Sequence, residues 1–384
     1  MKNFYLIIII LLIFPLFSTP KTAFAEESKE NFSDILNEQL SSIDFSKLND
    51  YLNSNLSEYD INFFSYIKKL ISGEYSIEFN NFLTYLSSIL LSNFSNIFSI
   101  IAGILSIAIL YKLVNEFSTF SDEIKSIIFF VSLSAVILLI FSAIFTAIQK
   151  VQTTINSLNN LISILSPIFV TVMASGGAGV SSAVFGVTHI YFNTITTSVI
   201  ILTVFPLIKT IIVLSIVNSI SNEIKLDAII KFINSLIKWI LGISFTIFTA
   251  FLSIKGITAS ITDGISLKAT KYAISNSIPI IGSYISGGFN LVIASSLLIK
   301  NALGVGALLL IILTVISPLI FVITLNLALK LTAGLTELIA DKKFFEPIEK
   351  ISNGISLLTV ALLGVAFMAF IMFFTIISTT NSFI

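Results

Sequence analysis

His189 is the residue whose side chain could most directly take part in acid–base or metal chemistry, because it is the only histidine in the sequence. No aspartate or glutamate lies within 30 residues of it on either side, and no second ligand stands at a spacing typical of a metal site. A proton relay inside a membrane would need a second ionisable partner. The sequence therefore favours a histidine that packs against other helices or lies at a membrane interface.

Asp263 is the second candidate, within the sequence Thr-Asp-Gly. Aspartate and glycine are typical of turns, and the carboxylate could accept hydrogen bonds from the amides that follow it, starting a helix at residue 265. The alternative is a carboxylate that faces an aqueous lumen. Its nearest charged companions in the sequence are Lys255, Lys268 and Lys271. The sequence alone leaves both interpretations open.

A third group of polar residues follows one stripe of a predicted helix. Its members are spaced by 4, 7 and 4 residues: Asn326, Lys330, Glu337 and Asp341. Leucine and isoleucine side chains fill the other faces. Such a helix either lies at the membrane surface with its polar face in water, or presents the stripe to a pore or a partner.

Two short elements share the order proline, apolar stretch, Ser-Gly-Gly and a further apolar stretch with Ser-Ser, at residues 166–187 and 279–301. Proline and paired glycines interrupt helices, and a bilayer tolerates an interruption only where protein or a cavity satisfies the backbone. We therefore predict two broken or re-entrant elements that form the core of the protein. Their residues are Pro167, Gly176, Gly177, Gly179, Pro279, Gly287 and Gly288. The many small residues favour close helix packing over a substrate site.

Common catalytic and cofactor-binding motifs are absent from the sequence. It contains no Walker motif, no His-Glu-x-x-His, no Gly-x-Ser-x-Gly and no dinucleotide-binding fingerprint. It has no cysteine, which excludes disulfides and thiolate metal sites. We therefore predict that the protein is not an enzyme and that it binds neither a cofactor nor a metal.

The elements that must position these residues are membrane helices, as the composition shows. The chain is 55% hydrophobic and 11% charged, with a mean hydropathy of +1.01. Soluble domains are about a quarter charged. The predicted fold class is an all-α polytopic integral membrane protein with about six or seven transmembrane helices, two broken elements and a small helical exterior segment.

The first 25 residues predict a cleaved signal peptide. An apolar region covers residues 4–17, and Ala23 and Ala25 form a small-x-small cleavage site. An uncleaved first membrane helix is the alternative, but 14 apolar residues are short for a span, which needs about 20. Residues 26–80, with 4 lysines and 11 acidic residues, would then be an acidic extracytoplasmic helical segment.

Residues 81–384 form the predicted multi-span membrane domain. The clearest spans are residues 89–111, 126–148, 239–254, 304–325 and 355–377. Between them we expect an exterior loop at 149–160, a surface helix at 222–238, a polar stretch at 255–271 and a charged loop at 341–350. The lysines of residues 112–125 favour a cytoplasmic location for the first loop.

Three blocks of this sequence resemble the stage III sporulation protein AE family. The most specific runs from Ile-Lys-Gly-Ile-Thr-Ala-Ser-Ile-Thr-Asp-Gly at residue 254 to residue 282 and continues as Ala-Ser-Ser-Leu-Leu-Ile-Lys-Asn-Ala-Leu-Gly at 294–304. The third block is Ala-Ser-Gly-Gly-Ala-Gly-Val-Ser-Ser-Ala at 174–183. The order of signal peptide, acidic exterior segment and multi-span region agrees with the family as well.

The resemblance implies a role in endospore formation. Family members lie in the mother-cell membrane around the engulfed forespore, which would place residues 26–80 in the intermembrane space. They belong to a multi-subunit channel or secretion-like complex with the other stage III sporulation A-operon proteins and the forespore protein Q. The family has no established catalytic residues, so the resemblance implies none here.

We therefore interpret the chain as a membrane subunit of a sporulation channel. Two other functions compete with this interpretation. A self-contained secondary transporter is favoured by repeated broken helices, and disfavoured by the scarcity of intramembrane carboxylates. A non-conducting membrane scaffold for the complex is the other alternative.

Overall fold

The computed structural model describes residues 29–56, 62–74, 79–117, 120–220, 226–277, 282–340 and 342–378, and every regular element in these ranges is a helix. The predicted signal peptide, residues 1–25, lies outside the described residues. Three short helices come first: α2 (Lys29–Ser41), α3 (Ser46–Asn55) and α4 (Phe63–Ser72).

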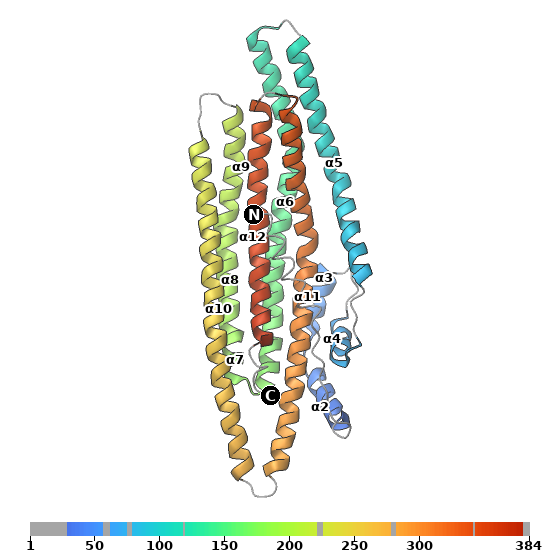
Figure 1. Ribbon diagram of the computed structural model, residues 1–384, viewed down its shortest axis with the longest axis vertical. Coiled ribbons are helices and arrows are strands. Elements are labelled where there is room, and N and C mark those ends of the chain that lie inside the picture. The colour runs from blue at the N-terminus through green and yellow to red at the C-terminus, as the bar shows by residue number, and fades with distance from the viewer. Residues whose placement is uncertain are drawn as a thin grey trace.

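The rest of the described chain forms longer helical stretches, one of which is divided into several segments (Figure 1). They are α5 (Phe79–Phe117), α6 (Asp122–Ser175), α7 (Gly179–Ala183), α8 (His189–Val199), α9 (Phe205–Ile220), α10 (Asp227–Ser277), α11 (Gly282–Glu337) and α12 (Lys342–Ser378). Two π-helical segments, η4 (Val184–Thr188) and η5 (Ile200–Val204), join α7, α8 and α9 into one stretch.

Six helical stretches in the described part of the chain are long and apolar enough to cross a membrane. They are α5, α6, the stretch from α7 to α9, α10, α11 and α12. This count confirms an all-α polytopic membrane protein and agrees with the lower of the two predicted numbers of spans. The chain runs up and down through them in sequence order (Figure 1).

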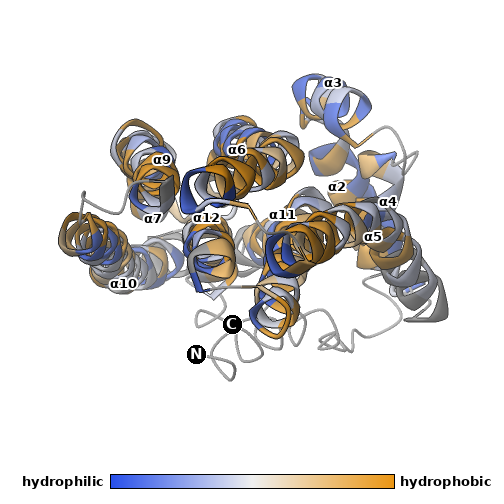
Figure 2. Cartoon of the chain, turned by 90° about the horizontal axis from the view of Figure 1, so that it is seen from above, coloured by the Kyte–Doolittle hydropathy of each residue, from blue (hydrophilic) through white to orange (hydrophobic). Residues whose placement is uncertain are grey.

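α12 is the central helix of the bundle. In Figure 2 it lies between α6, α10 and α11. Of the residues in its most apolar window, 67% are buried, against 22–44% in the other five stretches. Apolar side chains therefore fill the axis of the bundle, among them Leu358, Leu362, Ala369 and Phe373.

The predicted exterior loop at residues 149–160 is wrong, because these residues form the middle of α6. The stretch is polar, but it contains neither glycine nor proline, so its composition does not end the helix. The polar side chains bond locally or to α3 instead: Thr154 donates to the carbonyl of Lys150, and Ser157 donates to Asn55. The helix reaches 54 residues, roughly 80 Å at 1.5 Å per residue, far more than one bilayer crossing needs.

Three further predicted boundaries also fall inside helices. α10 runs unbroken from Asp227 to Ser277, so residues 227–238 are not a separate surface helix and 255–271 are not a polar linker. α12 begins at Lys342, so residues 342–350 of the predicted charged loop are helical. Serine, threonine and lysine are compatible with a helix, so the polar composition of these stretches does not end it.

The N-terminal helices α2, α3 and α4 pack against α6 and α11 beside the bundle (Figure 2). Leu40, Leu48 and Phe63 are buried there. The hydroxyl of Tyr51 donates to the carbonyl of Ser157 in α6 at 3.2 Å, and burial raises the pKa of this tyrosine. The side chain of Gln39 contacts Ser295 and Ser296 of α11. The apolar side chains of these short helices therefore pack on the long helices of the bundle.

Candidate functional site

The first predicted broken element is present, but the break lies at its glycines and not at its proline. α6 continues through Pro167 and ends at Ser175. Gly177 then has a φ of 78°, a left-handed conformation that glycine adopts without steric cost. α7 begins at Gly179. The predicted break at Pro167 is therefore wrong, whereas Gly176 and Gly177 form the turn.

The second predicted broken element differs from the first. α11 starts at Gly282 and runs through Gly287 and Gly288, so the predicted break at these two glycines is wrong. A glycine inside a helix keeps its backbone hydrogen bond and weakens the helix by only about 1 kcal/mol. Pro279 lies outside the described residues. The similarity between the two sequence elements therefore does not extend to their structure.

Asp263 holds the start of α7 from a distance of more than 80 residues in sequence. One carboxylate oxygen accepts the backbone N–H of Val180 at 2.8 Å and the other accepts that of Ser181 at 2.8 Å. The side chain is 1% exposed. Because the first N–H groups of a helix lack partners within it and carry partial positive charge, they stabilise this buried carboxylate.

The predicted role of Asp263 in starting its own helix at residue 265 is wrong, since α10 is continuous there. Its carboxylate caps another helix instead. One turn along α10, the side chain of Leu267 covers Gly177 so closely that an added Cβ would lie 2.5 Å from it. Asp263 and Leu267 together fix the turn between α6 and α7 against α10.

A column of buried polar side chains follows this turn along α7 and α8. Ser181 and His189 are 0% exposed, Asn193 is 1% exposed and Thr197 is 3% exposed. Each has one buried atom that no group among the described residues bonds: Oγ of Ser181, Nε2 of His189, Oδ1 of Asn193 and Oγ1 of Thr197. The last three residues are four apart, which places them on one helix face. We call these four residues the polar column.

His189 packs in the interior of the bundle, as one of the two sequence interpretations predicts. Its Nδ1 lies 3.3 Å from the carbonyl oxygen of Val184, and its ring centroid lies 4.2 Å from that of Phe185. A contact with a carbonyl makes Nδ1 the donor in the neutral ring. Nε2 is then a hydrogen-bond acceptor.

Asn193 connects the polar column to α6. Its amide nitrogen donates to Oδ1 of Asn159 at 2.7 Å, and Thr194 reaches the same oxygen at 3.4 Å. Asn159 belongs to the polar stretch that was predicted to be a loop. This bond links α8 to α6. Where water is excluded, removing either amide would leave the other as a buried polar group without a partner, which is costly.

The two π-helical segments lie on either side of the α-helical turns that carry His189, Asn193 and Thr197. Short π-helical insertions of this kind occur frequently at functional sites. No group of three His, Cys, Asp or Glu side chains able to hold a metal ion occurs in the described ranges. The column carries hydroxyl, amide and imidazole groups whose unbonded atoms could each donate or accept one further hydrogen bond.

The predicted polar stripe on α11 divides into separate environments. Asn326 faces α12, where its amide donates to Ser356 at 2.9 Å and its Oδ1 accepts from Ser352 at 2.6 Å. Lys330 and Glu337 are exposed, and Asp341 lies outside the described residues. The leucines of the neighbouring face are exposed as well: Leu327 at 56%, Leu331 at 63%, Leu335 at 43% and Leu338 at 83%. The polar residues of the stripe therefore do not form a single hydrated face of α11 opposite a buried apolar face.

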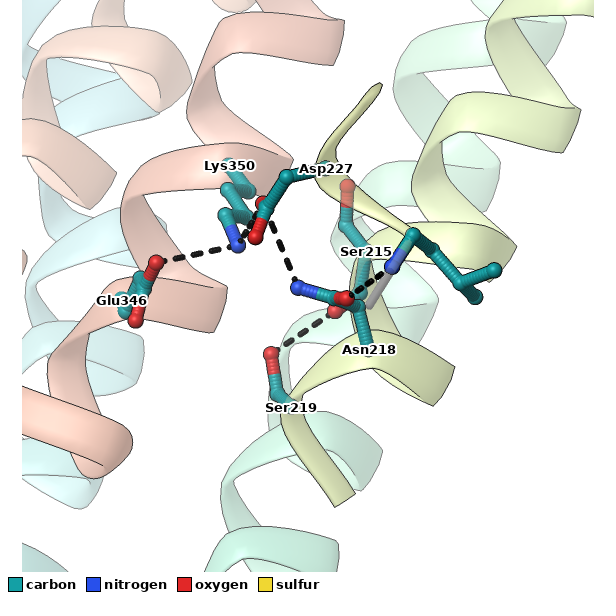
Figure 3. A network of polar contacts seen from close by, with 7 residues as sticks. Ser215, Asn218, Ser219, Asp227, Glu346 and Lys350 are labelled. Atoms are coloured by element: carbon teal, nitrogen blue, oxygen red, sulfur yellow. Dashed lines mark hydrogen bonds and ion pairs between the residues drawn. The ribbon is translucent and has the colours of Figure 1, made fainter. Parts of the chain in front are cut away.

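A polar network joins α9, α10 and α12 at one end of the bundle (Figure 3). Lys350 lies 2.6 Å from the carboxylate of Asp227 and 3.0 Å from that of Glu346. Asn218 donates to Asp227 at 3.3 Å and accepts the backbone N–H of Leu226 at 2.7 Å. The network fixes the ends of three helices relative to one another.

Sequence reasoning missed Asn159, Ser181, Asn193 and Thr197. A signal was available, since 189, 193 and 197 repeat every four residues within an apolar region. The network at Lys350 was also missed, although Glu346 and Lys350 stand four apart, as ion pairs on a helix do.

Comparisons with known proteins point to one family. A family model described as "Stage III sporulation protein AE" matches residues 61–380. A curated relative from Bacillus subtilis (strain 168), named "Stage III sporulation protein AE", is 29% identical over 275 residues, covering 71% of this chain and 68% of the relative. No solved structure matches.

Proposed function

Because the chain belongs to the stage III sporulation protein AE family, we propose that it is a membrane subunit of the stage III sporulation channel, a secretion-like complex linking mother cell and forespore. In this proposal it lies in the mother-cell membrane around the engulfed forespore. Residues 26–80 face the intermembrane space. Its partners are the other stage III sporulation A-operon proteins and the forespore protein Q.

The observation that carries the proposal is the filled axis of the bundle. α12 occupies the centre, and its apolar side chains pack against those of α6, α10 and α11. Two hollows, of about 640 and 780 Å³, are lined by residues of α10 alone and by residues of α3, α6 and α11, and the central helix α12 lines neither of them. A conduit in which this chain takes part is therefore formed between several chains, which fits a subunit better than a self-contained channel.

A secondary transporter is the weaker alternative. Its main support was a matched pair of broken helices, and the described residues contain only the break at Gly177. The buried carboxylate of Asp263 is bonded to two backbone amides and so is not free to couple an ion. A non-conducting scaffold would share the filled axis, so only a flux measurement separates it from a channel subunit.

The test begins with a strain lacking this gene, complemented by an affinity-tagged copy. Heat-resistant spores should require the copy, and mild solubilisation should recover it with the other stage III sporulation A-operon proteins. Liposomes containing the purified chain alone should release no trapped dye, whereas liposomes containing the recovered complex should.

Each outcome separates the alternatives. Solute uptake driven by an ion gradient through the purified chain alone would establish the transporter. If the complex assembles but liposomes containing it release no dye, whether or not this chain is present, the chain would be a non-conducting scaffold. Normal spore numbers without the gene would contradict a role in sporulation altogether.

A further inference from the structure

Lys209 stands alone in a long uncharged part of the sequence. Between residues 151 and 222 it is the only residue that carries a full charge at neutral pH. It lies in α9, within the apolar run 199–220, about ten residues or roughly 15 Å from either end of that run. Since a bilayer core is about 30 Å thick, this position is near its centre. A lysine at this depth is too far from either interface for its side chain to reach water.

The chain itself provides no acidic partner for Lys209. The side chain is exposed, and none of the ion pairs among the described residues includes it. Apart from Asp263, every acidic residue of the described long helices lies within eight residues of a helix end. Asp263 is buried and bonded to backbone amides. No carboxylate of the described chain therefore lies beside Lys209.

The surroundings of Lys209 on the outer face of α9 are mainly apolar. Leu202 is 74% exposed, Val213 is 57% exposed and Val217 is 39% exposed. α9 stands at the edge of the bundle (Figure 2). A water-filled pore would require a polar lining, whereas a single charge surrounded by exposed apolar side chains is typical of a helix–helix contact that encloses one ion pair.

The backbone beside Lys209 also favours a protein neighbour over lipid. Pro206 has no N–H, so it cannot donate the hydrogen bond that an ordinary α-helix would make to Leu202. The segment just before it is π-helical. A carbonyl freed by proline in a membrane helix needs another donor, and a neighbouring helix is one of the groups that can supply it. Thr210 donates its hydroxyl to the carbonyl of Pro206 at 2.9 Å. Lys209 is the one charged side chain of this face, and none of the described ion pairs includes it.

We propose that the face of η5 and α9 formed by Leu202, Pro206, Lys209, Val213 and Val217 is an interface with another membrane protein. The partner is a transmembrane helix with one aspartate or glutamate near its centre, and this carboxylate pairs with Lys209. A second copy of this chain does not fit, because its described helices expose no acidic residue at that depth. The inference needs only the membrane location and does not depend on the proposed channel.

The test uses cross-linking at a single cysteine, which the absence of native cysteine makes specific. Val213→Cys, in the full-length protein in sporulating cells, should cross-link through a short maleimide–photoreactive probe to one membrane protein. Lys209→Leu should lower the yield at least tenfold, while Lys209→Arg, which keeps the charge, should retain most of it. Leu138→Cys on α6, which is 74% exposed, is the matched control and should give no product of that size.

The identity of the product decides the proposal. Mass spectrometry should place the cross-link next to a mid-membrane acidic residue, and changing that residue to its amide should lower the yield as Lys209→Leu does. An undiminished product in Lys209→Leu, a product with a second copy of this chain, or a product with lipid only would overturn it. A partner with no part in sporulation would support this interface and contradict the proposed function.

Discussion

Single residues fix the turn between α6 and α7, and Gly177 is the most constrained of them. Gly177→Leu should destabilise the protein by about 2–4 kcal/mol, because it adds a side chain at positive φ and forces it into Leu267. Thermal unfolding in detergent and heat-resistant spore counts measure the effect. Gly242→Leu is the control, since a Cβ there has open space. Equal effects from both would show that the turn has no special role.

Gly364 cannot serve as a second control, although it lies inside the long apolar helix α12 as Gly242 lies inside α10. A Cβ at that position would overlap the ring of Phe245 on α10. Nor does Gly287 repeat the situation of Gly177, because α11 is continuous through it. Close approach between helices depends on partners distant in sequence, so it cannot be read from the glycine and its neighbours.

The second prediction at this scale concerns Asp263. Asp263→Asn should destabilise the protein by about 1–2 kcal/mol and Asp263→Leu by about 2–4 kcal/mol. The amide accepts only one of the two backbone N–H groups, and the leucine accepts neither. Chemical denaturation in detergent is the measurement, with the exposed neighbour Thr262→Ala as the control. An Asp263→Leu variant as stable as the wild type would show that the carboxylate does not hold α7.

At the scale of elements, a substitution in the polar column should raise the stability of the protein and lower its function. Thr197→Val replaces a buried hydroxyl, which has no partner in the part of the chain that the structure describes, by a methyl group of similar shape. We expect it to raise the free energy of unfolding by about 1 kcal/mol and to lower spore formation, as a polar residue kept for function would. Thr332→Val, whose hydroxyl already bonds to the carbonyl of Ala328, should not gain stability. A Thr197→Val variant that sporulates normally would remove the column from the functional site.

The sequence predicts the helical elements well where the cause is local. Apolar runs of sufficient length predict the spans, and the break at Gly176 and Gly177 follows from paired glycines. Gly73 ends α4 as its C-cap with a φ of 72°, a conformation that glycine adopts readily. Residues 149–160 were misassigned because a polar stretch reads as a loop when its partners on α3 and α8 are unknown. The capping of α7 by Asp263 joins residues more than 80 apart, which no local pattern can reveal.

At the scale of the whole molecule, Ser54, beside the middle of α6, and Ser121, at the start of α6, should face opposite sides of the membrane. Ser54, at the end of α3, and Ser121, at the start of α6, are both exposed. Ser54→Cys should react with an impermeant maleimide applied from the exterior, because an export signal is predicted to precede it. Ser121→Cys should react only after the cytoplasm is opened. Labelling of both from one side would contradict the topology.

α6 is an unbroken α-helix of 54 residues, whereas the neighbouring stretch from α7 to α9 contains two π-helical segments. α6 departs from regular i→i−4 hydrogen bonding only at Pro167, whereas the second stretch departs from it at both π-helical segments, so we expect the second stretch to deform more easily. If a partner protein exerts a force on one end of the bundle, we expect α6 to bend little. The deformation then concentrates at η4 and η5. α8 lies between η4 and η5, so we expect such a force to reorient the side chains of α8 most easily.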